Sequence, residues 1–299
     1  MKKVMLIYNP HSGDRAFKTN LDAFITALQG FGFVVHLFRL DGLINLDEYL
    51  SKLDDNQYDA IAASGGDGTI NSIINSMITN KINIPLTIIP SGTANDFAKF
   101  LNMPNDAKAL ADLINIKNVI WADIGQVNEK FFINVCGAGL FTNVSQRVNV
   151  GMKSTLGKLA YYLKSLEEIP NFQPISVRIT NSKEVMEMEI FLFLALNSQG
   201  TGGFEKLVPN ACVSDGLLDF LVVKSCSIVD LGKLFIKILR QDFLNEPNIL
   251  YFQDNFVKIE MLEENLKYNT CDIDGEYGPK LPLTIKNIHK KIPLIIPPQ

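Results

Sequence analysis

Cysteine, histidine and tryptophan are scarce in this chain of 299 residues, which has four cysteines, three histidines and one tryptophan. The cysteines lie far apart and form no C-x-x-C pair, so we predict no zinc site and expect reduced, mostly buried thiols. They are Cys136, Cys212, Cys226 and Cys271. His36 and His289 have no partner that the sequence reveals, and no histidine is predicted to act as a catalytic base.

Long basic runs and long apolar runs are also missing. The net charge is −4, so nucleic acid is not expected as a partner. The longest apolar stretches, such as Ile190–Leu196, are far shorter than the roughly 20 residues of a membrane helix. The apolar run before Asn9 has only five residues, which is short of the about 7–15 of a signal-peptide core. We therefore expect a cytoplasmic protein with no transmembrane segment.

The length predicts two domains, and the residue pattern places their boundary near residue 125. Residues 1–125 alternate strand-like runs with amphipathic helical runs at Phe17–Gln29 and Ile70–Ile78. The strand-like runs are Val4–Tyr8, Phe33–Leu40, Tyr58–Ala63 and Leu86–Pro90. This alternation predicts an α/β domain with a parallel sheet, helices on both faces, and ligands bound at the carboxyl ends of the strands.

Residues 126–282 are predicted to form a second, β-rich antiparallel domain. Its expected strands are Lys130–Val135, Ile175–Thr180, Val185–Leu196, Leu217–Val223, Phe256–Leu262 and Leu266–Ile273. Two helices, Leu156–Ile169 and Ile228–Leu244, interrupt them. The tail, residues 283–299, is partly apolar and proline-rich, and the sequence leaves open whether it returns to the first domain.

Three loops combine glycine with a hydroxyl or amide side chain, each after a predicted strand of the first domain. They are Asn9–Gly13, Gly65–Thr69 and Ser91–Asp96. Glycine lets the backbone approach a ligand closely, and Ser or Thr can either cap a helix or bind a phosphate oxygen. Any one loop could be a simple turn or helix cap, but three at one edge of a sheet favour a nucleotide site.

The motifs together resemble a known family. GGDGT at Gly65–Thr69 is followed by SGTANDFA at Ser91–Ala98, and Ile273-Asp274-Gly275-Glu276 contains a late DGE. NPHSG near the start, Asp123 in ADIG, and VPNA followed by DGLLD at Asp215–Asp219 extend the match. With these motifs the chain resembles the diacylglycerol kinase catalytic domain, similar to the sphingosine kinases, over nearly its whole length. GGDGT alone also occurs in NAD kinases and phosphofructokinases.

The resemblance implies roles for particular residues. Glu276 is implied as the proton acceptor toward the substrate hydroxyl, with Asp67 as a second catalytic residue. The implied ATP contacts are Asn9, Pro10, His11, Ser12, Gly13, Gly65, Gly66, Asp67, Gly68, Thr69, Thr93, Asn95 and Asp96. A Mg²⁺ site in the second domain is implied at the Asp215 side chain with backbone oxygens of Cys212 and Leu217. Asp67, Asp96 and Asp123 are implied as an acidic network beside the phosphates.

Asp67 stands where an anion is expected to bind. An aspartate repels a polyphosphate unless a cation lies between them, and phosphoryl transfer usually uses a divalent metal for this purpose. We interpret Asp67 as organising Mg²⁺, directly or through water. The loop lacks the lysine of a Walker loop, and the nearest basic candidates are Arg15, Lys18 and Lys99.

The sequence thus predicts an ATP- and Mg²⁺-dependent lipid kinase that phosphorylates a diacylglycerol-like lipid to phosphatidate. A sphingoid or other lipid kinase, an NAD kinase and a non-catalytic nucleotide-binding regulator are the alternatives. One departure is Phe38–Asp41, where the family often has a nucleotide-contacting threonine. No cysteine-rich lipid-recognition module precedes the loops, so we expect this chain itself to recognise a lipid substrate at the membrane surface. Either Leu156–Ile169 or the basic amphipathic run Ile228–Leu244 could contact the membrane, and a homodimer stays open.

Overall fold

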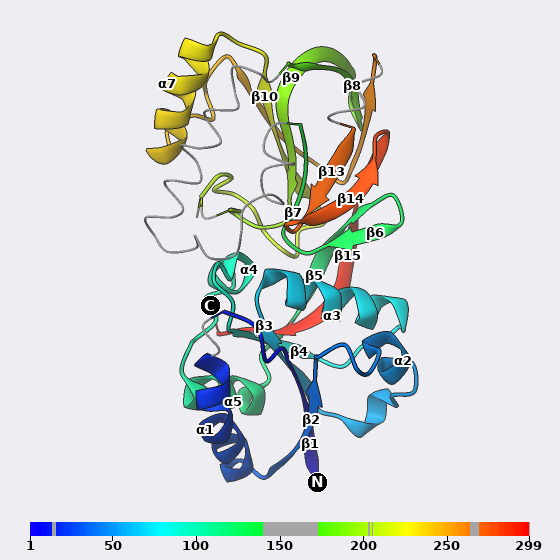
Figure 1. Ribbon diagram of the computed structural model, residues 1–299, viewed down its shortest axis with the longest axis vertical. Coiled ribbons are helices and arrows are strands. Elements are labelled where there is room, and N and C mark those ends of the chain that lie inside the picture. Colours follow the sequence, from blue (N-terminus) through cyan, green and yellow to red (C-terminus); the bar gives the residue numbers. More distant parts are fainter. Residues whose placement is uncertain (14–15, 140–172, 203, 205, 264–268, 299) are drawn as a thin grey trace. The chain divides into compact units, whose positions relative to one another are not determined.

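The computed structural model describes the chain except residues 14–15, 140–172, 203, 205, 264–268 and 299, and except the side chains of residues 16–19 (Figure 1). The predicted helix Leu156–Ile169, Arg15, the Lys18 side chain and the first three residues of the predicted strand Leu266–Ile273 lie outside the described residues. The chain divides into two compact units. Unit 1 contains residues 1–123 and 289–299, and unit 2 contains residues 124–288. The chain passes between them within β5 (Val119–Val127) and β15 (Leu283–Ile295).

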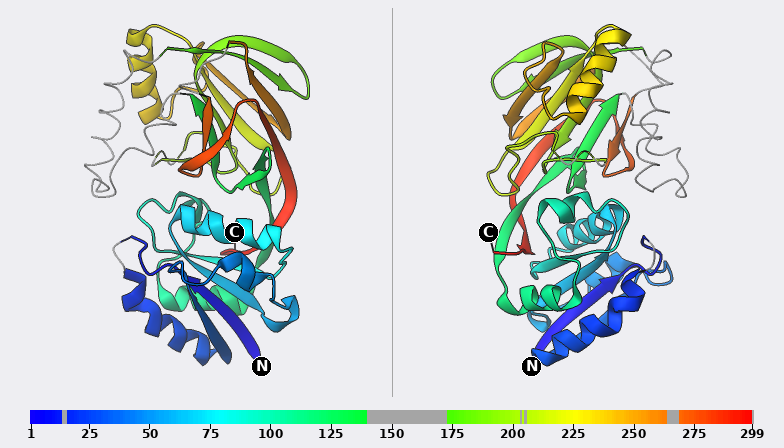
Figure 2. Two further views of the ribbon diagram at one scale, coloured as in Figure 1. Left: turned by 45° about the vertical axis from the view of Figure 1, so that its right-hand side comes forward. Right: turned by 90° about the vertical axis from the view of Figure 1, so that its left-hand side faces the viewer.

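Unit 1 is built on a parallel sheet in the order β15-β4-β3-β1-β2. Its other strands are β1 (Lys2–Tyr8), β2 (Phe33–Arg39), β3 (Ala60–Gly65) and β4 (Leu86–Pro90). Helices α1 (Ala16–Gly30) and α5 (Ala107–Ile116) pack together on one face, and α2 (Leu46–Leu50) packs with α3 (Asp67–Thr79) on the other (Figures 1 and 2). A short helix, α4 (Asp96–Phe100), follows β4, and a 3-10 turn spans Asp55–Gln57. The predicted α/β architecture is confirmed.

The core of unit 1 follows from its sequence pattern. The central strand β3 is buried at every position, as expected for a strand covered by helices on both faces. Helix α3 buries the apolar side that its spacing predicts, namely Ile70, Ile73, Ile74, Met77 and Ile78. Helix α5 was not predicted, yet Asp106 caps it by accepting a hydrogen bond from the Ala109 N–H at 2.9 Å.

Unit 2 is an antiparallel β domain, as the sequence predicts. Its strand order is β14-β13-β7-β9-β8-β12-β15, with β10 between β9 and β11 and with β6 paired to β5. The strands are β6 (Lys130–Phe132), β7 (Val135–Gly139), β8 (Ile175–Asn181), β9 (Val185–Leu196), β10 (Leu218–Lys224), β11 (Ile249–Asp254), β12 (Phe256–Met261), β13 (Thr270–Ile273) and β14 (Glu276–Lys280). The aromatic rings of Phe220 and Phe252 stack at 5.2 Å within it.

Two predicted elements differ from the structure for local reasons. The strand predicted over Lys130–Val135 is split into β6 and β7, because the backbone N–H groups of residues 133–135 donate to the Asp274 carboxylate instead of a neighbouring strand. The helix predicted over Ile228–Leu244 ends at Leu239, forming α7 (Ile228–Leu239). Gln241 follows with φ +58°, a left-handed conformation that ends a helix.

Among the described residues, no helix combines the length and the apolar character that crossing a membrane requires. All four cysteines are free; Cys136 and Cys271 are buried, Cys226 is half-buried and Cys212 is exposed.

Candidate functional site

The strand register brings the three glycine loops of unit 1 to one edge of the sheet. Tyr8, the last residue of β1, pairs with Ser64 of β3, and Gly65 pairs with Pro90, the last residue of β4. The loops after β1, β3 and β4 therefore begin side by side at the carboxyl ends of adjacent parallel strands. This is the edge at which open α/β sheets bind ligands.

The glycines let these loops pack backbone against backbone. A Cβ atom on Gly92 would overlap Cα of Gly66, and one on Gly13, which has φ +50°, would clash with the Ser91 carbonyl oxygen. Gly66 also precedes α3 without any side-chain cap, so no cap side chain occupies the N–H groups of the first helical turn. Such N–H groups, together with the helix dipole, attract phosphate.

Hydrogen bonds join the loops at their roots. Asn9 of the first loop donates from its backbone N–H to the Ser64 carbonyl at 2.9 Å and from Nδ2 to Thr69 Oγ1 at 3.0 Å. The hydroxyl groups of Ser64 and Ser91 lie 3.0 Å apart. Asn9 also accepts from the N–H of His11 at 2.9 Å, which closes the first loop on itself. The predicted first, second and third loops thus form one connected group.

The remaining predicted residues of these loops differ in exposure. Pro10 is buried, Ser12 is half-buried, and His11 and Thr93 are exposed. Gly68 lies in the first turn of α3. Their contact with a nucleotide stays a prediction.

Asn95 holds the third loop in its conformation. It has φ +52° and ψ +41°, and its Oδ1 accepts from the Gly92 N–H at 2.8 Å while its Nδ2 donates to the Gly92 carbonyl at 2.8 Å. Asparagine suits this position because it tolerates the left-handed region and supplies both a donor and an acceptor. Asn95 therefore shapes the loop from within.

Asn95→Ala is expected to lower the free energy of unfolding by about 2–3 kcal/mol, since two hydrogen bonds are lost and alanine is strained in the left-handed region. Asn95→Gly loses the same bonds without the strain, so its loss should be smaller by about 1 kcal/mol. Both should weaken ATP binding. Urea unfolding and titration calorimetry measure the two effects; equal destabilisation by Ala and Gly would contradict the strain argument.

Asp67 and Asp96 meet at the start of α4. The Asp67 carboxylate accepts a hydrogen bond from the Phe97 N–H at 3.2 Å, and Asp96 is the first residue of the same helix. Lys99, one of the basic candidates, lies exposed on α4. The structure thus brings two of the three predicted acidic residues to one helix terminus.

Asp123, the third acidic residue, is fully buried in β5 and bound to β15. Its Oδ1 accepts from the His289 Nδ1 at 2.8 Å and from the Lys290 N–H at 2.8 Å. Lys290 has φ +51°, so the carboxylate fixes a bend in the strand. No local signal could have predicted this contact, because Asp123 and His289 are 166 positions apart. Whether Asp123 joins Asp67 and Asp96 in a network stays a prediction.

In unit 2, a tight turn positions Glu276. The turn residues Asp274 and Gly275 have φ +50° and +91°, and Glu276 follows as the first residue of β14 with its side chain exposed. Asp274 Oδ1 accepts from the N–H groups of Asn134 at 3.0 Å and Val135 at 2.8 Å, and its Oδ2 accepts from the Ile133 N–H at 2.8 Å. The turn that carries Glu276 is therefore anchored to the segment between β6 and β7.

A buried polar network extends from this anchor. Asn197 donates from its backbone N–H to the Asn134 carbonyl at 2.9 Å and from Nδ2 to the Ile133 carbonyl at 3.1 Å. The Ser198 hydroxyl bonds to Asn134 Oδ1 and lies 3.0 Å from the Gly200 carbonyl. Asn134, Asn197 and Ser198 could not be predicted from the sequence, because polar residues at strand ends give no pattern of their own.

The predicted metal loop forms a turn before β10. Asp215 is exposed and accepts from the Leu217 N–H at 3.0 Å, across Gly216 with φ +84°. The Leu217 carbonyl accepts from Asn287 Nδ2 at 2.9 Å. The exposed Cys212 has its Sγ 3.6 Å from Ser214 Oγ. The Asp215-Gly216 turn therefore exists whether or not a cation binds.

A buried carboxylate stands beside this loop. Asp219 accepts from the Tyr251 hydroxyl at 2.5 Å and from Gln253 Nε2 at 3.1 Å. Burial raises the pKa of Asp219, the two hydrogen bonds oppose that rise, and the charge of Asp215 adds to it. Burial, followed by the Asp219 carboxylate, raises the pKa of Tyr251.

The described side chains alone do not form a metal-binding site. Within the part of the chain that the structure describes, no group of three or more His, Cys, Asp or Glu side chains is arranged to hold a metal ion. The set predicted at Asp215 is of another kind, since it combines one carboxylate with two backbone carbonyls.

Both parts of the chain match known protein families. Residues 3–127 match the diacylglycerol kinase catalytic domain, and residues 134–296 match the YegS C-terminal NAD kinase beta sandwich-like domain. The chain belongs to the diacylglycerol kinase family. The two matches cover the glycine loops and the Glu276 turn respectively, and they confirm the resemblance that the motifs indicate.

Diacylglycerol kinases of bacteria are similar to this chain in sequence over nearly its full length. It is 34% identical over 300 residues to a diacylglycerol kinase of Bacillus subtilis (strain 168), covering 99% of this chain and 97% of the relative. It is 33% identical over 297 residues to a diacylglycerol kinase of Staphylococcus saprophyticus, covering 99% and 96%.

Solved structures of diacylglycerol kinases have the same fold as this family member. A crystal structure of a diacylglycerol kinase from Bacillus anthracis str. Sterne superimposes with a TM-score of 0.79 at 28% identity, covering 99% of this chain and 98% of the other. Another crystal structure from that organism gives a TM-score of 0.84 at 31% identity, covering 99% and 96%. The chain is a lipid kinase with an α/β catalytic domain and a β-rich second domain.

Proposed function

We propose that the chain transfers the γ-phosphate of ATP to the hydroxyl of a diacylglycerol in a Mg²⁺-dependent reaction that yields phosphatidate. The observation that carries the proposal is the backbone-to-backbone packing of three glycine loops at the carboxyl edge of the unit 1 sheet. Loops of this kind present N–H groups to a polyphosphate. The family and the names of its relatives support a lipid as the acceptor.

Glu276 is the residue we propose as general base. In the reaction its carboxylate takes the proton of the acceptor hydroxyl while that oxygen attacks the γ-phosphorus, and ADP leaves. Among the described residues, none forms a hydrogen bond or ion pair with the Glu276 side chain, so the carboxylate is available to a substrate. The anchored turn before it limits the positions that it can take.

The residues proposed for Mg²⁺ fit a hard cation. When bound beside ATP, Mg²⁺ neutralises negative charge on the phosphate oxygens. At the unit 2 loop the donors are oxygens only, and the Leu217 carbonyl, which accepts one bond from Asn287, keeps a second lone pair. At the unit 1 loops, Asp67 and Asp96 are the carboxylates that we propose to organise the metal near the phosphates.

Asp215→Asn is expected to weaken the Mg²⁺ dependence of stability while keeping the turn. Asparagine can still accept the Leu217 N–H through its side-chain oxygen, so the charge is lost but the local conformation is not. The wild-type protein should gain about 2.7 kcal/mol at Mg²⁺ one hundred times its Kd, and the variant should gain much less at the same concentration. Thermal melting across a Mg²⁺ titration measures the difference.

Asp215→Ala serves as the comparison because it removes the turn bond as well. It should lose some stability at every Mg²⁺ concentration and should also lose the Mg²⁺-dependent part. If both variants keep the wild-type response to Mg²⁺, Asp215 is a turn residue and the proposed cation site is rejected.

The activity itself is tested with radiolabelled ATP and a panel of acceptors. The expected result is transfer to diacylglycerol that requires Mg²⁺ and gives a product that migrates as phosphatidate. Sphingosine and NAD are the comparison acceptors. Preferred transfer to sphingosine would show that the chain is a sphingoid kinase and not a diacylglycerol kinase. Transfer to NAD would show that it is an NAD kinase. ATP binding without transfer to any acceptor would indicate a non-catalytic regulator.

A further inference from the structure

Helix α7 carries apolar side chains both on the side that packs against unit 2 and on a side that is exposed. Leu231 and Leu234 are buried against the sheet. Four other apolar residues are largely exposed, with exposed fractions of 60% for Ile228, 67% for Val229, 51% for Ile236 and 49% for Leu239.

The exposed residues form a continuous stripe. Positions 228, 232, 236 and 239 follow one another at spacings of four, four and three, so they line one side of the helix. Val229 lies beside Gly232, three positions away and on the same side of the helix as Ile236, and widens the line. Gly232 sits in the middle of the helix, where a Cβ would meet nothing within 4 Å, so the stripe is open to a flat partner at that point. We call Ile228, Val229, Gly232, Ile236 and Leu239 the α7 stripe.

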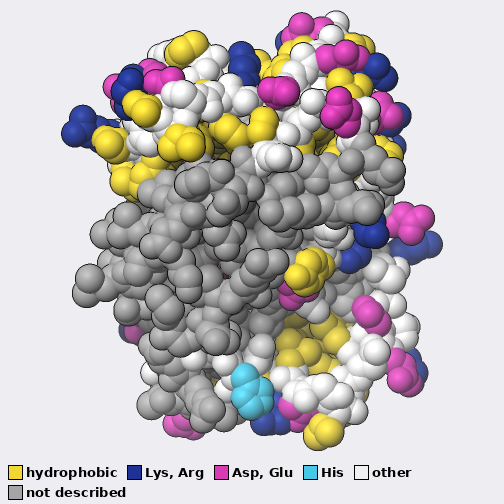
Figure 3. Space-filling model, turned by 45° about the horizontal axis from the view of Figure 1, so that its top comes forward, with side chains coloured by type: hydrophobic (Ala, Val, Ile, Leu, Met, Phe, Trp, Pro, Cys, Tyr) yellow, Lys and Arg dark blue, Asp and Glu magenta, His cyan; other side chains and the backbone are white. Residues whose placement is uncertain are grey.

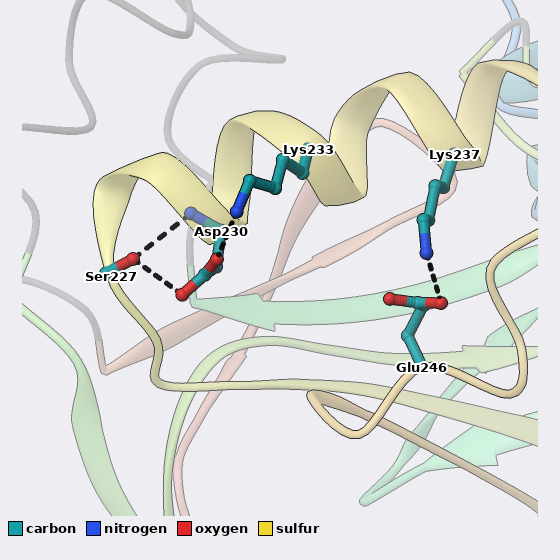
Figure 4. Close-up of polar contacts among 5 residues, drawn as sticks. All are labelled: Ser227, Asp230, Lys233, Lys237 and Glu246. Carbon is teal, nitrogen blue, oxygen red and sulfur yellow. Dashed lines mark hydrogen bonds and ion pairs between the residues drawn. The ribbon is translucent and has the colours of Figure 1, made fainter.

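Helix stability does not explain the α7 stripe. Val and Ile form helices less readily than Ala, Gln or Lys, and Gly is poorer still, so a helix that faced only water would gain from polar residues at these positions. Ser227 already caps the helix by accepting from the Asp230 N–H at 3.1 Å (Figure 4). The stripe is largely exposed among the described residues and therefore indicates a binding partner.

Basic residues border the α7 stripe. Lys233 and Arg240 follow it on one side, and Lys237 lies further round the helix. Lys233 pairs with Asp230 at 3.2 Å and Lys237 with Glu246 at 2.5 Å, while no carboxylate among the described residues pairs with Arg240 (Figure 4). The helix and its C-cap carry three cations against one carboxylate, and Glu246 beyond the helix balances one more, so Arg240 supplies the excess positive charge in a chain whose net charge is −4. Figure 3 shows hydrophobic, basic and acidic side chains beside one another over the upper part of unit 2.

We propose that the α7 stripe and its basic border dock on an anionic lipid bilayer. The inference rests on the proposed function in one respect, since a diacylglycerol acceptor is dissolved in a bilayer. A helix with an apolar face and cations along its edge can lie in the interface, with the apolar residues among the acyl chains and the cations at the headgroups. A second copy of the chain fits less well, because two stripes in contact would bring their basic borders together.

The test measures vesicle binding without any turnover. Val229→Gln/Ile236→Gln removes apolar surface and keeps the helix, since glutamine is the better helix former. Co-sedimentation with phosphatidylcholine–phosphatidylglycerol vesicles should fall at least about tenfold for this variant. Lys233→Gln/Arg240→Gln should bind anionic vesicles roughly tenfold less and should lose the salt dependence of binding. Val185→Gln is the matched control, because Val185 is 61% exposed on β9 and lies outside α7.

Kinetics separate this inference from the proposed function. The apolar variant should lose activity toward long-chain diacylglycerol in vesicles but retain it toward a short-chain, water-soluble diacylglycerol. If no lipid is phosphorylated while vesicle binding still depends on α7, the proposed function fails and the docking surface stands. Wild-type binding by the α7 variants, or an equal loss with Val185→Gln, would overturn the inference. It would also be overturned if light scattering showed that the variants change only self-association.

Discussion

Glu276→Gln is expected to lower turnover about 10²–10⁴-fold while ATP binding changes little. Glutamine has the shape of glutamate but cannot accept the proton of the substrate hydroxyl. Within the described residues the Glu276 side chain forms no bond that the substitution would break, so the melting temperature should stay close to that of the wild type. Steady-state kinetics with saturating ATP and diacylglycerol, together with ATP titration, measure the two quantities.

The kinetic constants distinguish a base from a residue that only binds. If Glu276 takes the proton, the variant should lose kcat while KM for diacylglycerol changes little, whereas the loss of a residue that only binds the lipid would raise KM. Glu184→Gln is the matched control, because Glu184 is an exposed carboxylate of the same unit in the loop between β8 and β9. Turnover within a few-fold of the wild type, or a rise in KM with kcat unchanged, would remove Glu276 from the role of base.

Much of the fold could be predicted because its signals are local. The buried run of β3 and the five apolar positions of α3 follow directly from strand and helix periodicities. Strand β15 could not be read in this way, since its middle carries charged residues and its conformation depends on Asp123, more than 160 positions earlier. Local patterns therefore identify the elements, whereas the course of β15 within unit 1 depends on tertiary contacts.

The candidate site also has parts that the sequence predicts and parts that depend on tertiary contacts. The glycine loops could be predicted because glycine, Ser and Asn after a strand have a direct physical meaning. Their contacts with one another, such as Asn9 with Thr69, follow only from the strand register. The role of Asp274 could not be predicted at all, because the N–H groups that it accepts belong to residues about 140 positions away.

Asp274→Ala is expected to lower both stability and turnover. The substitution removes three hydrogen bonds from backbone N–H groups to a carboxylate and places alanine at φ +50°. A loss of about 2–4 kcal/mol follows, or roughly 4–16 °C in the melting temperature.

Asp274→Asn separates the two effects, because asparagine tolerates the left-handed conformation. Its single side-chain oxygen can keep the bonds from Asn134 and Val135, but its amide group opposes the Ile133 N–H. The loss of stability should therefore be about half that of alanine. Turnover should still fall at least about tenfold, with KM for ATP unchanged, because the turn no longer holds Glu276 in one position. A variant that is destabilised as expected but retains full kcat would show that Asp274 stabilises unit 2 without positioning Glu276.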